Sequence, residues 1–85
     1  MGILAKVKNM EVKFKSTQND IEKTKILNEL REFSMVEQGL EDVSTADKNE
    51  IWKQAFSGEP EKTCFSEIFM NVGEIGRKYK EEGVV

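Results

Sequence analysis

The sequence predicts a small α+β domain that is mainly α-helical, with an N-terminal β-hairpin (or a short helix) followed by three helices. Three observations lead to this prediction: an alternating apolar pattern near the start, three later segments with apolar residues at helical spacing, and turn or capping residues between them. An all-α bundle is the alternative. The 85 residues are expected to form a single domain.

Residues 1–15 form the N-terminal segment, in which the stretch ILAKVKNMEVKF fits two patterns. As a hairpin with its KN pair in the turn, the stretch places six apolar residues on one face and Lys6 opposite Glu11 on the other. As a helix, it carries apolar residues at i, i+4, i+7 and i+11 from Ile3. The strand-like ending VKF and the lack of an N-cap residue favour the hairpin.

Three helices are expected, over residues 20–38, 45–57 and 62–82. A polar break, STQND, supplies capping residues for the first, and Gly39 follows its end, as glycine typically does. Ser44 and Asp47 have the spacing of a capping box at the start of the second helix. The third has the most continuous apolar stripe, from Phe65 to Tyr79, and is expected to be the central helix.

The composition excludes the usual covalent supports of a small domain. One cysteine cannot form an intrachain disulfide, and a chain with no histidine lacks the ligands of a zinc site. A core of this size is marginal by itself, so we expect self-association, with a homodimer as the first expectation. No segment has the roughly 18 apolar residues of a membrane span or the features of a signal peptide, which indicates a cytoplasmic protein without membrane contact.

The charge is unevenly distributed over a chain with a net charge of −3. Residues 1–15 carry a net charge of +3, whereas residues 26–61 contain nine acidic and three basic side chains. An acidic surface repels phosphate backbones, so nucleic-acid binding is not expected. The same surface suits a basic protein partner.

Gly73 and Gly76 interrupt the stripe of the third helix, although each interior glycine costs about 1 kcal/mol relative to alanine. Three interpretations remain open: close packing of another backbone on this face, a break between two helices, or a gap for a ligand. Arg77, Lys78 and Lys80 follow the glycines. These cations either complement the helix dipole or, with lysines of the N-terminal segment, form a site for a small anionic ligand such as a nucleotide.

Trp52 and Phe56 are one turn apart in the second predicted helix and are either core residues or an exposed anchor for a partner. No residue qualifies as catalytic. Cys64 has no histidine to activate it and is expected to be inert, and the carboxylate pairs lie on charged outer faces. We therefore expect no enzyme activity, no metal and no cofactor.

The expected function is a non-catalytic protein–protein interaction module that acts as a homo-oligomer and inhibits a partner by occupying its basic surface. The acidic helix over 20–38 or the edge of an N-terminal strand would make the contact. One alternative is an oligomer that binds a small anionic ligand near Gly73–Lys80, and another is a structural subunit of a larger assembly. Short chains of this type are common among phage products, an association that suggests a phage-encoded protein.

Overall fold

The computed structural model describes residues 2–56 and 64–82 and consists of four α-helices within these ranges. In chain order they are α1 (Ile3–Ser16), α2 (Asp20–Glu37), α3 (Thr45–Ala55) and α4 (Phe65–Glu82). The described ranges contain no strand. The fold is all-α, so the predicted α+β class with an N-terminal hairpin is wrong, and the alternative of an all-α bundle is correct.

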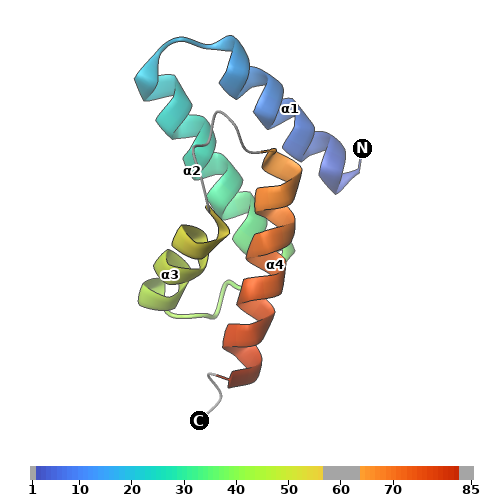
Figure 1. Cartoon of the computed structure of the whole chain (residues 1–85), viewed down its shortest axis with the longest axis vertical. Coiled ribbons are helices and arrows are strands. Elements are labelled where there is room, and N and C mark those ends of the chain that lie inside the picture. Colours follow the sequence, from blue (N-terminus) through green and yellow to red (C-terminus); the bar gives the residue numbers. More distant parts are fainter. Residues whose placement is uncertain (1, 57–63, 83–85) are drawn as a thin grey trace.

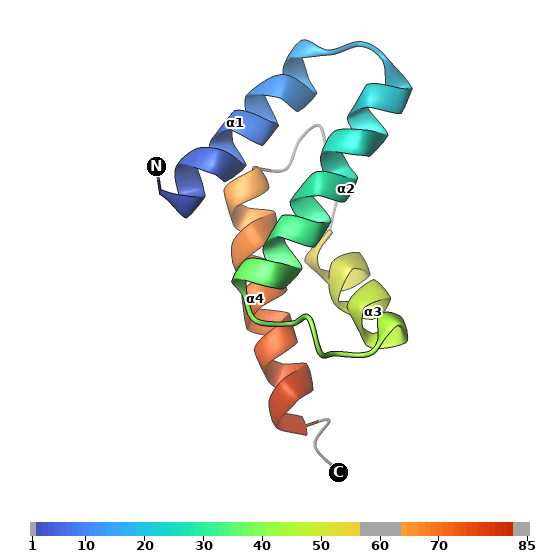
Figure 2. The same cartoon turned by 180° about the vertical axis from the view of Figure 1, so that it is seen from behind.

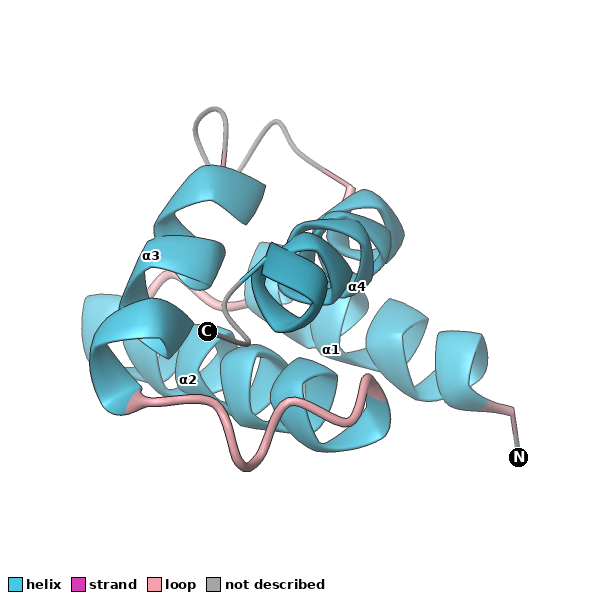
Figure 3. Cartoon of the chain, turned by 90° about the horizontal axis from the view of Figure 1, so that it is seen from below, coloured by secondary structure: helices cyan, strands magenta, loops and turns pink. Residues whose placement is uncertain are grey.

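Helix α4 is the central element, because each of the other three helices packs against it. Figure 1 shows α1 and α2 as an antiparallel hairpin around the first half of α4, and α3 beside its second half. The view from behind shows the loop between α2 and α3 passing close to α4 (Figure 2). Seen from below, α3 and α1 lie on opposite sides of α4 (Figure 3). The three helices predicted after the N-terminal segment correspond to α2, α3 and α4, and predicted ends at residues 57 and 62 lie outside the described residues.

Helix α1 occupies the segment for which the hairpin was predicted, and its burial pattern gives the reason. Val7 and Phe14 are buried and Met10 is half-buried, a spacing of three and four residues that belongs to a helix. Val12, which the hairpin would have placed on the same buried face, is 58% exposed. The helix also spares Lys8 the positive φ of a two-residue turn. Its N-cap, Gly2, makes no side-chain capping bond, so contacts with α2 and α4 hold the helix in place of a local start signal.

Helix α2 begins and ends with local signals that the sequence displays. The Asn19 side chain accepts the backbone N–H groups of Ile21 and Glu22. At the other end, Gly39 has φ +72°, its N–H donates to Val36 O at 3.1 Å, and Leu40 N–H donates to Met35 O at 2.8 Å. This pair of bonds is the Schellman motif, which turns the chain sharply after a helix. It directs the Leu40 side chain toward α4, where it is buried.

The core lies between the four helices and, among the described residues, is formed by twelve buried apolar side chains. Aromatic pairs join the helices, with ring centroids 5.3 Å apart for Phe14 and Phe65 and 6.0 Å apart for Phe33 and Phe69. Helix α4 supplies Phe65, Ile68, Phe69 and Val72 to this core, so its predicted apolar stripe is confirmed. Ser34 is also fully buried, and its hydroxyl has no hydrogen-bond partner in the described part of the chain.

Glu11 connects α1 to the start of α4. Its Oε1 accepts the backbone N–H of Phe65 at 2.6 Å, and its Oε2 lies 3.5 Å from Lys15 Nζ. The Phe65 N–H, at the positive end of the α4 dipole, holds the pKa of the Glu11 carboxyl below its usual 4.5; partial burial opposes the shift, and Cys64 and Lys15 add to it. The contact spans 54 positions of the chain, so it fixes one helix against another.

Glu11→Gln is expected to lower the free energy of unfolding by about 1 kcal/mol near neutral pH, because a charged cap of α4 is lost. A lowered folded-state pKa contributes stability above pH 4.5 that disappears as the pH falls through the lowered pKa. The difference between the wild type and Glu11→Gln should therefore shrink below pH 4.5, as measured by urea unfolding followed by circular dichroism. Glu74→Gln, an exposed carboxylate on α4, is the control and should show no such trend. A difference that stays constant with pH would contradict the role of the carboxylate charge.

Candidate functional site

Gly73 and Gly76 are both buried, and α4 continues through them without a break. The interpretation of two separate helices is therefore wrong. A methyl group added at Gly73 would lie 2.7 Å from Cδ of Gln38, and one added at Gly76 would lie 2.7 Å from Cδ2 of Leu40. The glycines allow close packing, and the segment that approaches them is the chain's own connection after α2. Gln38 reinforces this contact, since its Nε2 donates to Phe69 O at 3.2 Å.

The cations after the glycines do not converge on one point. Arg77, Lys78 and Lys80 are all exposed. Arg77 and Lys80, three residues apart, lie on one side of the helix, and Lys78 points about 100° away from Arg77. Lys80 Nζ lies 3.7 Å from Asp42 Oδ1, in the loop between α2 and α3. The lysines of α1 lie near the opposite end of α4, since α1 packs at its first half (Figure 1). The anion site that would combine the two groups of cations is thus not assembled within the described residues.

Trp52 and Phe56 are half-buried and pack against the core, with ring centroids 4.8 Å apart in an edge-to-face arrangement. They lie at the edge of the core, with part of each side chain exposed. Cys64 is exposed at the start of α4, and its Sγ lies 3.3 Å from Ser66 Oγ. No group of three cysteine, aspartate or glutamate side chains in residues 2–56 and 64–82 is placed to hold a metal ion.

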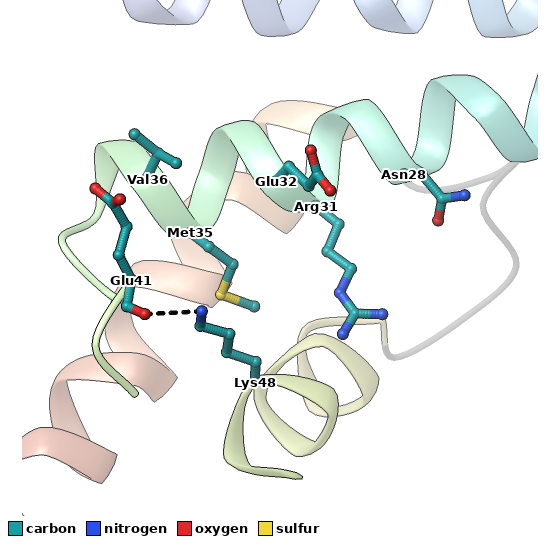
Figure 4. Close-up of a pocket in the computed structure, with 7 residues that line it drawn as sticks. All are labelled: Asn28, Arg31, Glu32, Met35, Val36, Glu41 and Lys48. Carbon is teal, nitrogen blue, oxygen red and sulfur yellow. Dashed lines mark hydrogen bonds between the residues drawn. The ribbon is translucent and has the colours of Figure 1, made fainter. Parts of the chain in front are cut away.

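A hollow of about 500 Å³ lies between α2 and α3. Both helices pack on α4 and diverge from each other. Arg31 of α2 donates to the Asn49 side chain of α3, and Lys48 Nζ of α3 donates at 2.8 Å to Glu41 O in the loop that follows α2. Figure 4 shows Arg31, Met35 and Lys48 reaching into this space. The hollow is lined by Asn28, Arg31, Glu32, Met35, Val36, Glu41 and Lys48.

The cationic and the acidic side chains around the hollow differ in whether they have partners within the described part of the chain. Arg31 and Lys48 both use their cationic groups in hydrogen bonds within the chain. The carboxylates of Glu32 and Glu41 form no ion pair or hydrogen bond within the part of the chain that the structure describes. Figure 4 shows the Glu41 carboxyl group and Val36 pointing away from the space between the helices. The free groups at this site are therefore acidic and apolar.

The sequence around the hollow strengthens the acidic character. Residues 32–47 contain five acidic side chains and no basic one. The last turn of α2 has no basic residue to balance the negative end of the helix dipole, and Glu37 lies at that end. Negative potential therefore concentrates at the C-terminal end of α2 and in the following loop.

Comparison of the chain with known protein families, with curated proteins and with solved structures gives no match. Within the described ranges, no helix combines the length and the apolar content that a membrane crossing requires. The chemistry of the chain's own surface is thus the basis for a functional proposal.

Sequence reasoning missed the hollow between α2 and α3. The acidic bias of residues 26–61 is visible in the sequence. The sequence does not show that the cationic groups of Arg31 and Lys48 form hydrogen bonds within the chain. A local signal existed in Gly39, because a Schellman motif places the next apolar residue against the fold and so fixes where the loop turns. The divergence of α2 from α3 depends on how each packs on α4, which no local pattern reports.

Gly76→Ala is expected to lower the free energy of unfolding by about 1–3 kcal/mol, because the new methyl group overlaps the buried Leu40 side chain. In the background of Leu40→Ala the overlap is gone. There the same substitution should cost nothing or stabilise by up to about 1 kcal/mol, through higher helix propensity. Chemical unfolding of the four variants of this cycle measures both values. An equal cost of Gly76→Ala in the two backgrounds would show that Leu40 does not occupy the glycine face.

Proposed function

We propose that the protein is a non-catalytic protein-binding module, which docks a basic segment carrying an apolar anchor at the hollow between α2 and α3. The observation that carries this proposal is the juxtaposition, at the rim of this hollow, of unpaired carboxylates with the exposed apolar side chain of Val36. Glu32 and Glu41 line the same hollow as Met35 and Val36. A lysine or arginine beside a leucine-type side chain would satisfy both features at once.

The electrostatic part of the proposal depends on which charges are free. Because Arg31 and Lys48 are engaged within the chain, an incoming anion would have to compete for them. An incoming cation meets Glu32 and Glu41 without such competition. The acidic surplus of residues 32–47 extends the attraction beyond direct contacts and would raise the association rate.

The apolar part depends on Met35 and Val36. Met35 is 4% exposed and forms the floor of the hollow, and Val36 is 51% exposed at its rim. The hydrogen bonds from Arg31 to α3 and from Lys48 to the loop after α2 are polar bridges at this hollow, and exposed hydrogen bonds contribute little net free energy. A side chain entering from a partner could therefore exchange these bridges for contact with the methionine, which adapts easily to new neighbours.

Occupation of a basic surface blocks whatever anion that surface binds, so the module would act as an inhibitor of its partner. We also propose that the chain self-associates, since a domain of 85 residues without a disulfide gains stability from a second copy. A contact through the edge of an N-terminal strand is not possible, because this segment is the helix α1. The Gly73–Lys80 segment gives less support to a small anionic ligand, since its glycines face Gln38 and Leu40.

A helical peptide with one leucine and one lysine on the same face of each turn is a suitable probe for this proposal. Nuclear magnetic resonance titration of the full chain should move the backbone signals of Glu32, Met35, Val36 and Glu41. Replacing both carboxylates (Glu32→Gln with Glu41→Gln) is expected to weaken binding about tenfold, because two charge contacts of roughly 0.5–1 kcal/mol each are lost. Raising the salt concentration should weaken binding in the wild type more than in this variant.

The matched control is Glu67→Gln with Glu74→Gln, two exposed carboxylates on the outer side of α4. This control has the same change in net charge and should bind as the wild type does. Equal weakening in both double variants would mean that net charge, and not the hollow, attracts the peptide. Binding that does not respond to salt would also count against the proposal.

A further inference from the structure

The outer side of α2 carries a stripe of exposed residues that no other described element covers. We define this outer stripe as Ile21, Lys25, Asn28, Glu32 and Val36, which follow one another at intervals of three and four residues. The buried residues Ile26 and Leu30 lie on the opposite side of the helix. Two members of the stripe are large and apolar, with Ile21 75% exposed and Val36 51% exposed.

The outer stripe is complementary to itself when read in the reverse direction. Its midpoint falls between Asn28 and Glu29. Lys25 precedes Asn28 by three residues and Glu32 follows Glu29 by three. Ile21 precedes Asn28 by seven residues, and Val36 follows Glu29 by seven. Two antiparallel copies of α2 around a two-fold axis at this midpoint therefore place Lys25 opposite Glu32 and Ile21 opposite Val36, each twice.

The alternative orientation lacks this complementarity. Two parallel copies of α2 in register place Lys25 opposite Lys25 and Glu32 opposite Glu32, and like charges at this position repel. No ion pair within the described part of the chain uses Lys25 or Glu32, so both remain available to a second molecule. The charge pattern thus selects the antiparallel pair.

The shape of the surface agrees with the charge pattern. A second hollow, of about 340 Å³, is lined by Asp20, Ile21, Thr24, Lys25 and Asn28. It meets the hollow between α2 and α3 at Asn28, which lines both. A two-fold axis beside Asn28 lays the Ile21 end of one copy against the Val36 end of the other, so each hollow receives side chains of the second copy.

We infer that the outer stripe of α2 is the interface of an antiparallel homodimer, and that this dimer covers the surface proposed for the basic partner. The turn formed by Ile21 and Lys25 of the second copy presents an apolar side chain beside a lysine, which is the chemistry proposed for the partner. Self-association and partner binding then exclude each other, a consequence that rests on the proposed function. The contact is limited to about 22 Å of helix, so the dimer is weak and dissociates at micromolar concentrations.

Sedimentation velocity over a wide range of protein concentration tests the dimer. Lys25→Glu and Glu32→Lys should each raise the dissociation constant at least about tenfold, because each places like charges opposite one another twice. The double variant, Lys25→Glu with Glu32→Lys, should return to within about threefold of the wild type, since the two charges are exchanged across the axis. Ile21→Asp should abolish the dimer.

Matched controls lie on α1, where Lys8 and Val12 are also exposed. Lys8→Glu and Val12→Asp should leave the dissociation constant unchanged, and circular dichroism verifies that every variant is folded. A wild type that stays monomeric at millimolar concentration, or a double charge exchange that fails to restore dimerisation lost in the single variants, would overturn the inference.

Competition with the leucine–lysine peptide separates this inference from the proposed function. Monomeric Ile21→Asp should bind the peptide at least as tightly as the wild type, and peptide addition should dissociate the wild-type dimer. A dimer that passes the charge-exchange test without any peptide binding would contradict the proposed function alone. A peptide that binds the intact dimer would contradict the shared surface.

Discussion

The approach of Leu40 to Gly76 is the contact on which the arrangement of α2, α3 and α4 depends. Gly39 ends α2 with a positive φ, and the two hydrogen bonds of the Schellman motif aim the next side chain at α4. The Leu40 side chain packs against Gly76, and the Gln38 side chain packs against Gly73, where α4 has no Cβ atoms. Each glycine lowers the helix propensity of α4, and the buried Leu40 offsets this cost with apolar contact. Because the chain crosses α4 at this point, α3 is delivered to the far side of α4 from α1, as seen in Figure 3.

The hollow follows from the same crossing. A loop that runs over α4 carries α3 onto that helix and away from α2, so the two helices share α4 as their support and leave space between them. Hydrogen bonds from Arg31 and Lys48 fill part of this space. These bonds use the local cations and leave the carboxylates of Glu32 and Glu41 without partners in the described residues. The surface chemistry of the site is therefore a result of packing, and not only of the acidic composition of the segment.

The sequence predicted the features that depend on neighbouring residues and missed those that depend on distant ones. The caps at Asn19 and Ser44, the end of α2 at Gly39 and the stripe of α4 each follow from local chemistry, and each is present. Helix α1 was predicted as a hairpin because its apolar residues satisfy both periods. Contacts with residues far along the chain determine that this segment is a helix. One such residue is Phe65, whose N–H donates to Glu11 and whose ring packs on Phe14. Close packing was one of three interpretations of the two glycines, and the residues that pack against them could not be named without the turn after α2.

The two sides of α2 have separate roles in this account. Its inner side, with Ile26 and Leu30, belongs to the core and determines whether the domain folds. Its outer side carries the exposed apolar residues Ile21 and Val36, which do not contribute to the core. Exposed apolar surface of this kind lowers the solubility of a monomer. These apolar residues and the charges between them form a pattern that is complementary to itself in the reverse direction. A second copy can use that pattern, whereas a solvated monomer cannot. Because the two sides face opposite directions on one helix, the outer residues can change in charge while the core packing stays as it is, so association can be adjusted independently of folding.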